Sequence, residues 1–243
     1  MITLIGTGHI FDLTAALNTI FDEKQPDVIC VELDRQRYQA LILKTTQPDA
    51  YKQREKNLPI MYKMLARFQD NMADEYGVTA GAEMLTAIQY AQTHGLPVEF
   101  IDAEAQCLFL SMWKNMPIRE KLRLMLSAFG GFFVSKKTVE KELEQIQDNL
   151  DTYLEEIGKK FPSIKKTLLD DRNQLMAGRL IQLNQTYQQV IACVGDGHIP
   201  GLSKILTEKN IPMTTIRLHE LQAIKKEPAD TSSAQFSINY KHP

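Results

Sequence analysis

Apolar residues form two kinds of run along the chain, and their alternation predicts an α/β fold. Residues 2–5, 28–31 and 190–194 are short, mainly apolar runs, which are typical of buried parallel strands. After the first run, Asp12 can cap a helix. The predicted apolar face of this helix carries Leu13, Ala16, Leu17, Ile20 and Phe21. A strand, a helix and a second buried strand form a βαβ unit, so we expect a central, mostly parallel sheet.

The rest of the pattern extends this sheet and interrupts it once. Further strands are predicted at residues 98–102 and about 213–218, and amphipathic helices at 49–76, 80–94 and 202–209. Residues 103–188 contain no convincing strand, and helices are predicted there at 118–126, 138–158 and 163–188. We interpret this segment as a helical insertion that serves as a cap or a dimerisation arm. We expect a single domain over residues 1–225 and a disordered, polar tail over 226–243.

Nearly the same text follows the first strand and the strand at 190–194. The first copy is Gly6-Thr7-Gly8-His9-Ile10 and the second is Gly195-Asp196-Gly197-His198-Ile199. Each copy leads into a predicted helix and then a strand, so the sheet is predicted to contain two similar strand–turn–helix–strand units. In open α/β sheets, ligands bind at the turns that follow the carboxyl ends of the strands. We therefore hypothesise that His9 and His198 share one site.

Carboxylates are predicted at the same edge of the sheet. Glu32 follows the second strand, and Asp102 ends the third. Together, His9, Glu32 and His198 would make a set of two histidines and one carboxylate that leaves coordination positions open for water or substrate. The alternative, which the spacing leaves open, is that each histidine hydrogen-bonds its own loop. Asp34 is better explained as a helix cap, whereas Asp102 can serve as a cap or in the site.

Other polar residues have an ordinary explanation when taken alone. Glu83 lies in a predicted helix and is typical of a solvated charge. Arg172 and Asn173 lie in the middle of a predicted helix, where the pattern favours a solvated face. Neither copy of Gly-x-Gly-His is a phosphate-binding loop, because the Gly-Lys-Ser/Thr ending and the third dinucleotide glycine are missing.

The composition narrows the classes of partner. The chain is 44% hydrophobic and 24% charged with a net charge of −2, so we expect no nucleic-acid binding. Cys30 and Cys193 fall in predicted buried strands, which indicates a reducing compartment. The longest apolar stretch, residues 124–134, is too short to span a bilayer, and we expect no signal peptide before the first strand. These features predict a cytoplasmic protein without a membrane span.

Several segments, in order, resemble the TraB/PrgY family, which is related to the Tiki metalloproteases. They are Gly6-Thr7-Gly8-His9, Pro26 to Asp34 with Arg37, Gly81-Ala82-Glu83-Met84, Ile101-Asp102, Trp113 with Glu120-Lys121-Leu122, Asp171-Arg172-Asn173 with Met176, and Val194 to Gly201. The set covers about residues 1–220. Each motif alone is weak, but the ordered set is specific.

The resemblance implies a peptidase that depends on a divalent metal ion such as manganese, cobalt or zinc. By this resemblance His9, Glu32 and His198 hold the metal, and Arg172 and Asn173 join them as catalytic residues that stabilise the developing oxyanion. Substrate binding is assigned to Arg37, Glu83 and Asp102. The chain departs from many relatives in two respects. It has Ala103 where they have arginine after the aspartate, and it lacks their membrane-spanning helices.

Three hypotheses for function follow. The first is a metal-dependent hydrolase that acts on peptides, as in the pheromone-shutdown and Tiki branches. The second is a protein that sequesters a peptide or small ligand without cleaving it, with the apolar segment 129–134 as a lid. The third is an interaction module in which that segment forms a contact, with a homodimer as the default assembly.

Overall fold

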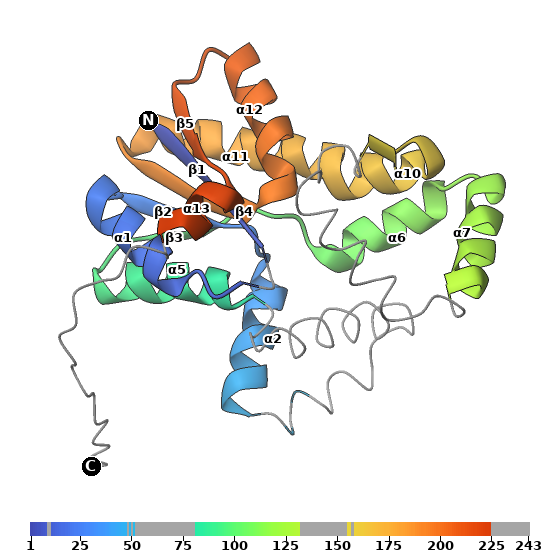
Figure 1. The fold of residues 1–243 in the computed structure, drawn as a ribbon, viewed down its shortest axis with the longest axis horizontal. Helices are drawn as coiled ribbons and strands as arrows, with labels where there is room; N and C mark the ends of the chain where they lie inside the picture. Colours follow the sequence, from blue (N-terminus) through green and yellow to red (C-terminus); the bar gives the residue numbers. More distant parts are fainter. Residues whose placement is uncertain are drawn as a thin grey trace.

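A computed structural model of the chain describes residues 1–8, 11–47, 49, 51, 81–131, 155–156 and 158–224. Its sheet has five strands in the order β3-β2-β4-β1-β5 (Figure 1). The strands are β1 (Ile2–Thr7), β2 (Val28–Val31), β3 (Val98–Phe100), β4 (Val190–Gly195) and β5 (Met213–Ile216). Every pairing between neighbouring strands is parallel, which confirms the predicted α/β class.

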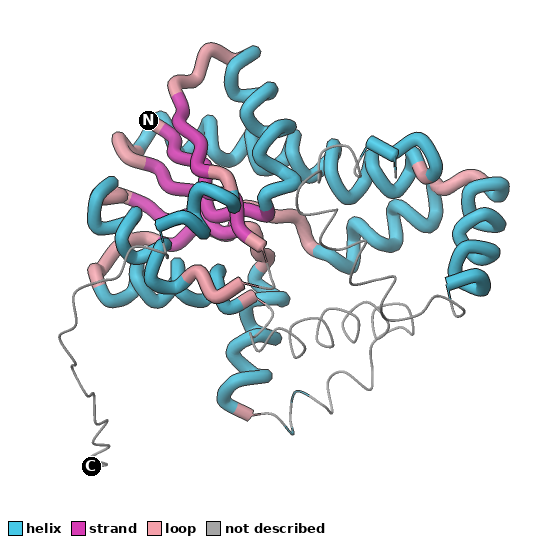
Figure 2. Tube along the Cα trace, in the orientation of Figure 1, coloured by secondary structure: helices cyan, strands magenta, loops and turns pink. Residues whose placement is uncertain are grey.

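Helices surround this sheet and also extend beyond it (Figure 2). They are α1 (Thr14–Lys24), α2 (Arg35–Thr46), α5 (Ala82–Thr93), α6 (Ala105–Asn115), α7 (Ile118–Gly131), α10 (Pro162–Lys165), α11 (Asp171–Thr186), α12 (Ile199–Glu208) and α13 (Leu218–Ile224). A π-helical turn, η1 (Lys166–Asp170), joins α10 to α11, and a 3₁₀ turn, η2 (Asp196–His198), precedes α12. Among the described residues, no helix combines the length and apolarity that crossing a membrane requires.

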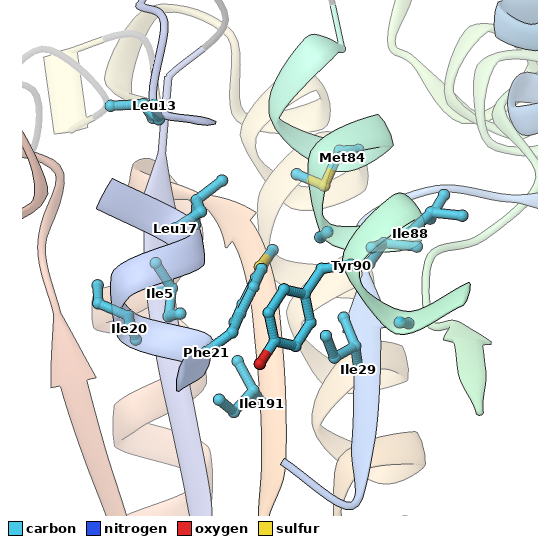
Figure 3. Close-up of a cluster of buried hydrophobic side chains, with 14 of the residues drawn as sticks. Ile5, Leu13, Leu17, Ile20, Phe21, Ile29, Met84, Ile88, Tyr90 and Ile191 are labelled. Carbon is cyan, nitrogen blue, oxygen red and sulfur yellow. The ribbon is translucent and has the colours of Figure 1, made fainter. Parts of the chain in front are cut away.

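The two faces of the sheet carry separate hydrophobic clusters, because successive side chains of a strand point to opposite faces. On one face, Ile5, Ile29 and Ile191 pack against α1 and α5, where Phe21 lies 4.8 Å from Tyr90 between ring centroids (Figure 3). On the other face, the next residues along each strand pack against α11 and α12. Burial on both faces explains why β1, β2 and β4 consist mainly of apolar residues.

The helices differ from the sequence predictions in three places. The predicted helix at 163–188 is interrupted by η1, while α6 and α13 were not predicted. α13 has only seven residues, too few for a helical period to stand out. Nearly all of the predicted helices at 49–76 and 138–158, residues 132–134 of the apolar segment and the tail at 226–243 lie outside the described residues.

The centre of the sheet is its topological switch point. β1 and β4 lie side by side, with Thr7 opposite Gly195. The helices that follow these two strands, α1 and α12, cover opposite faces of the sheet. A crevice at the carboxyl ends of the strands is expected at such a point. The turns after β1 and β4 therefore begin beside each other at the edge where a ligand is expected.

Asp196, in the turn after β4, ties this edge together. Arg217 donates to both of its carboxylate oxygens, from Nε at 3.0 and 3.1 Å and from Nη2 at 2.7 Å. The backbone N–H of Leu218 also donates to Oδ1, at 2.9 Å. A Cβ atom at Gly6 would lie 2.1 Å from the same Oδ1. Glycine is therefore required at position 6 by the carboxylate of the opposite turn.

Gly6→Ala is expected to displace Asp196 from Arg217 and to lower the free energy of unfolding by about 1–3 kcal/mol. Gly178→Ala is the matched control, because no atom lies within 4 Å of its added Cβ. In the helix α11, that change is expected to stabilise the protein by up to about 1 kcal/mol. Urea unfolding followed by circular dichroism measures both. Equal stability of the two variants would contradict the close approach at Gly6.

Candidate functional site

Glu32 lies at the centre of a group of polar side chains at the carboxyl edge of the sheet. It directly follows β2, and its backbone N–H continues the ladder by donating to the carbonyl of Cys193 at 3.0 Å. Its Oε2 accepts the backbone N–H of Gly195 at 2.6 Å, and its Oε1 accepts Nη2 of Arg172. The side chain is 10% exposed. Glu32 thus joins the ends of two neighbouring strands to a helix of the insertion.

Arg172 links Glu32 to a second strand-end carboxylate. It lies in the first turn of α11 and donates to Asp102 through Nε at 2.8 Å and through Nη2 at 2.7 Å. Its Nη1 donates to the carbonyl of Leu168, in the π-helical turn, at 3.1 Å. Asp102 is 3% exposed. The buried guanidinium is therefore held between two carboxylates, and a carbonyl of η1 fixes its orientation.

Arg37 extends the network toward solvent. It donates through Nε to Asp34 at 3.1 Å and through Nη2 to the carbonyl of Glu32 at 2.9 Å, and Nη2 also contacts Asp102. Asp34 caps α2 by accepting the N–H of Arg37 at 2.9 Å, which confirms its predicted role. The network thus sets three carboxylates against two guanidinium groups. An excess of negative charge among these side chains favours the binding of a cation.

His198 closes the network on its other side. Its Nδ1 lies 2.6 Å from Oδ1 of Asn173, which is a carbonyl oxygen and only accepts. Nδ1 therefore carries the hydrogen, and Nε2 faces Oε1 of Glu32 at 3.4 Å. Gly201 makes this arrangement possible, because a Cβ there would lie 2.1 Å from Nδ2 of Asn173. The close packing of α12 on α11 thus sets the orientation of the imidazole.

The network holds the carboxylate of Glu32 and the guanidinium of Arg172 in their charged forms. Burial alone would raise the pKa of Glu32, but His198, Arg172 and the N–H of Gly195 outweigh it and hold that pKa well below its usual range. Burial would likewise lower the pKa of Arg172, but the charges of Glu32 and Asp102 hold it above its usual value. A carboxylate this acidic is poorly suited to donate a proton near neutral pH.

Two donor atoms in this network fit a divalent metal ion. Ligands at about 2.1 Å from one ion, at tetrahedral angles, lie roughly 3.4 Å apart. That separation matches the distance between Nε2 of His198 and Oε1 of Glu32. The Nδ1–Asn173 bond is the kind of outer partner that a metal-bound histidine commonly has. Within the described residues, however, no group of three or more His, Cys, Asp or Glu side chains is arranged to hold a metal.

Most of the predicted site residues meet in this network. It contains Glu32, His198, Arg172, Asn173, Asp102 and Arg37. His9, the other predicted metal ligand, lies outside the described residues. The interpretation of Arg172 and Asn173 as part of a solvated face is wrong, because Asn173 is 3% exposed and Arg172 is held between carboxylates.

Glu83 is also buried, which overturns its interpretation as an ordinary solvated charge. It lies in the first turn of α5 and is 2% exposed. The pKa of the Cys193 thiol on β4 is raised by burial and further by the charge of Glu83. Glu83 is therefore buried on the α5 side of the sheet, where its charge disfavours ionisation of the Cys193 thiol.

Arg179 was not predicted as a site residue. Its Nη1 donates to the carbonyls of Phe100 and Asp102, both at 2.9 Å, and so fixes the chain where β3 ends. It follows Arg172 by seven positions in α11, so both side chains project from one face of the helix. This spacing is the feature of the sequence that could have indicated that Arg179 lies near Arg172. Asp196 and Arg217 were also missed, although Asp196 lies inside the second repeated motif.

The fold and the network together define an α/β protein with a charged site at the switch point of a parallel sheet. The chain belongs to the TraB/PrgY/gumN family, whose model matches residues 1–214. It is also similar to an uncharacterized protein of Methanocaldococcus jannaschii, with 28% identity over 230 residues. The match covers 93% of this chain and 58% of that relative, so the chain spans little more than half the relative's length.

Glu32→Gln is expected to lower the free energy of unfolding at neutral pH by about 3–5 kcal/mol, because Arg172 loses one buried partner. Since folding lowers the pKa of Glu32 from its ordinary 4.5, the ion pair stabilises fully above pH 4.5 and is lost as pH falls below that value. Below pH 4.5, the stability of the variant should therefore decline less steeply than that of the wild type. Urea unfolding at several pH values, with a chelator present, measures this.

The exposed Glu208 of α12 gives a matched control, and Glu208→Gln is expected to change the free energy of unfolding by less than about 0.5 kcal/mol. If Glu32→Gln declined in acid as steeply as the wild type, the charged pairing of Glu32 would be refuted.

Proposed function

We propose that the edge formed by the ends of β2, β3 and β4 binds a divalent metal ion and hydrolyses peptides. The observation that carries this proposal is the pair of donor atoms on His198 and Glu32, 3.4 Å apart, with the imidazole oriented by Asn173. His9 is proposed as the third ligand, because β1 ends beside β4 and His9 follows two residues after Thr7.

The side chains around these donors have separate tasks in the proposal. A divalent ion, when bound, polarises a carbonyl and lowers the pKa of water. Glu32 stays ionised at neutral pH and serves as a ligand. Arg172 orients Glu32 and Asp102, and Asn173 orients His198, because their polar atoms are already directed at these partners. These contacts favour positioning roles for Arg172 and Asn173 over direct stabilisation of an oxyanion.

The choice of a peptide as substrate rests on the resemblance to the Tiki branch. Arg37, which is 36% exposed, lies at the solvent side of the network and is the proposed contact for a substrate carbonyl or carboxylate. Asp102 keeps Arg37 and Arg172 together, and Glu83 is proposed to support the pocket from α5.

Non-catalytic binding of a peptide or small ligand is the second candidate. It is favoured by the two oxygens of Glu32, which already accept hydrogen bonds from Gly195 and Arg172. A site whose carboxylate is fully paired has less capacity for a metal and can hold a polar ligand through Arg37 instead. The two candidates differ in whether the ligand is cleaved before it leaves the site.

We also propose that the chain contains two copies of one unit. β1, α1 and β2 form the first copy, and β4, α12 and β5 form the second. In each copy the second strand does not pair with the first. β2 pairs with β4, and β5 pairs with β1. The crossover helices lie on opposite faces, as a two-fold axis along the strands between β1 and β4 requires.

Metal binding is tested first. Wild type, dialysed against Mn²⁺, Co²⁺ or Zn²⁺ and analysed by mass spectrometry, is expected to retain one ion per chain. His198→Ala should weaken affinity at least about 100-fold, and Asn173→Ala about tenfold, because Nδ1 loses its partner. The exposed His219 of α13 supplies the control, His219→Ala, which should bind like wild type. A wild type that retains no metal, or a His198→Ala that binds normally, would refute the metal site.

Hydrolysis is tested separately with a mixture of peptides followed by mass spectrometry. The metal-loaded wild type is expected to cleave peptides, and a chelator or His198→Ala should reduce the rate at least about 100-fold. His219→Ala should cleave normally. Retained peptides that are recovered intact would refute hydrolysis in favour of sequestration, and neither retention nor cleavage would refute both.

A further inference from the structure

The helix α7 follows α6 and lies away from the sheet (Figure 1). It presents an apolar stripe to solvent. The stripe consists of Ile118, Leu122 and Leu126, which are 75%, 55% and 71% exposed. Residues four apart lie on one face of a helix, so the three side chains form a continuous surface. Scattered exposed apolar residues are ordinary, but an aligned set that is more than half exposed marks a contact surface.

The charges of α7 are arranged around this stripe. Glu120, the helix's one acidic residue, faces the body of the protein and is 6% exposed. Its carboxylate accepts the backbone N–H of Ser163 at 2.8 Å and the hydroxyl at 2.6 Å. Arg119 and Arg123 are exposed, and Lys121 lies over the ring of Trp113 at 5.4 Å. On the helix, Lys121 lies to one side of the stripe and the arginines to the other.

We propose that α7 docks on an anionic lipid surface, with the stripe in the acyl boundary and the cations at the head groups. A helix with an apolar face bordered by Lys and Arg is suited to lie in such an interface. The charge on α7 disfavours pairing with a second copy, because two stripes in contact would bring like charges together. The proposal is independent of the hydrolase site, which lies at the edge of the sheet.

The full chain is tested by sedimentation with vesicles of phosphatidylcholine alone or mixed with phosphatidylserine. We expect binding to the mixed vesicles, little binding to phosphatidylcholine alone, and weaker binding as salt is raised. The double variant Leu122→Asp with Leu126→Asp should reduce binding at least about tenfold. Arg119→Glu should reduce it while leaving the apolar stripe intact.

Ile42→Asp is the matched control, since Ile42 is an exposed apolar residue on α2, away from α7. It should bind like wild type, and thermal unfolding of each variant confirms that it is folded. The proposal is overturned if wild type shows no preference for the anionic vesicles, or if the double variant and Arg119→Glu bind them normally. It is also overturned if light scattering shows a dimer that the double variant dissociates, which would assign the stripe to a second copy.

Discussion

A guanidinium group held between two buried carboxylates is the interaction on which the site depends. Arg172 comes from the helical insertion, whereas Glu32 and Asp102 follow two strands of the sheet. Charges this deeply buried are tolerated only when they are compensated, so removing any one of the three leaves another with fewer partners. The same contacts that shape the site therefore fasten α11 to the sheet, and with it α6, which contacts the π-helical turn.

The sequence predicted the sheet better than the insertion, for a physical reason. A strand buried on both faces is an unbroken apolar run, so residues 28–31 were predicted with the observed bounds of β2. Glu32 and Asp102 could be placed at one edge because parallel strands end together. The π-helical turn could not be predicted, since it depends on a backbone hydrogen bond from Asp171 to the carbonyl of Lys166, five residues earlier, and not on a period of apolar residues. Arg179 was missed because its spacing from Arg172 indicates a shared helix face but not the carbonyls that its long side chain reaches.

Two glycines, one in the second repeated motif and one just after it, acquire a specific meaning once the side chains are placed. Gly195 offers its N–H to Glu32, and a Cβ there would approach Oε2 to 3.3 Å. Gly201 leaves room for the Asn173 amide that orients His198. These glycines allow polar side chains from other elements to reach the backbone. Gly6 and Gly195 hold the same place in the two copies, and a Cβ at either position would approach a carboxylate oxygen. The repeated glycine therefore indicates where a side chain from another element comes close to the backbone, which turn propensity alone does not describe.

The order of the strands also constrains how the chain can assemble as it is synthesised. Among the described strands, β1 pairs with β4 and β5, and β2 pairs with β3 and β4. During translation, the β2–β3 ladder can form early, but β1 must wait until residue 190 and beyond have left the ribosome. Such a wait exposes an apolar strand to other chains. The nascent chain is therefore expected to need protection of β1, and a truncation before β4 leaves β1 without a pairing strand and apart from the β2–β3 pair.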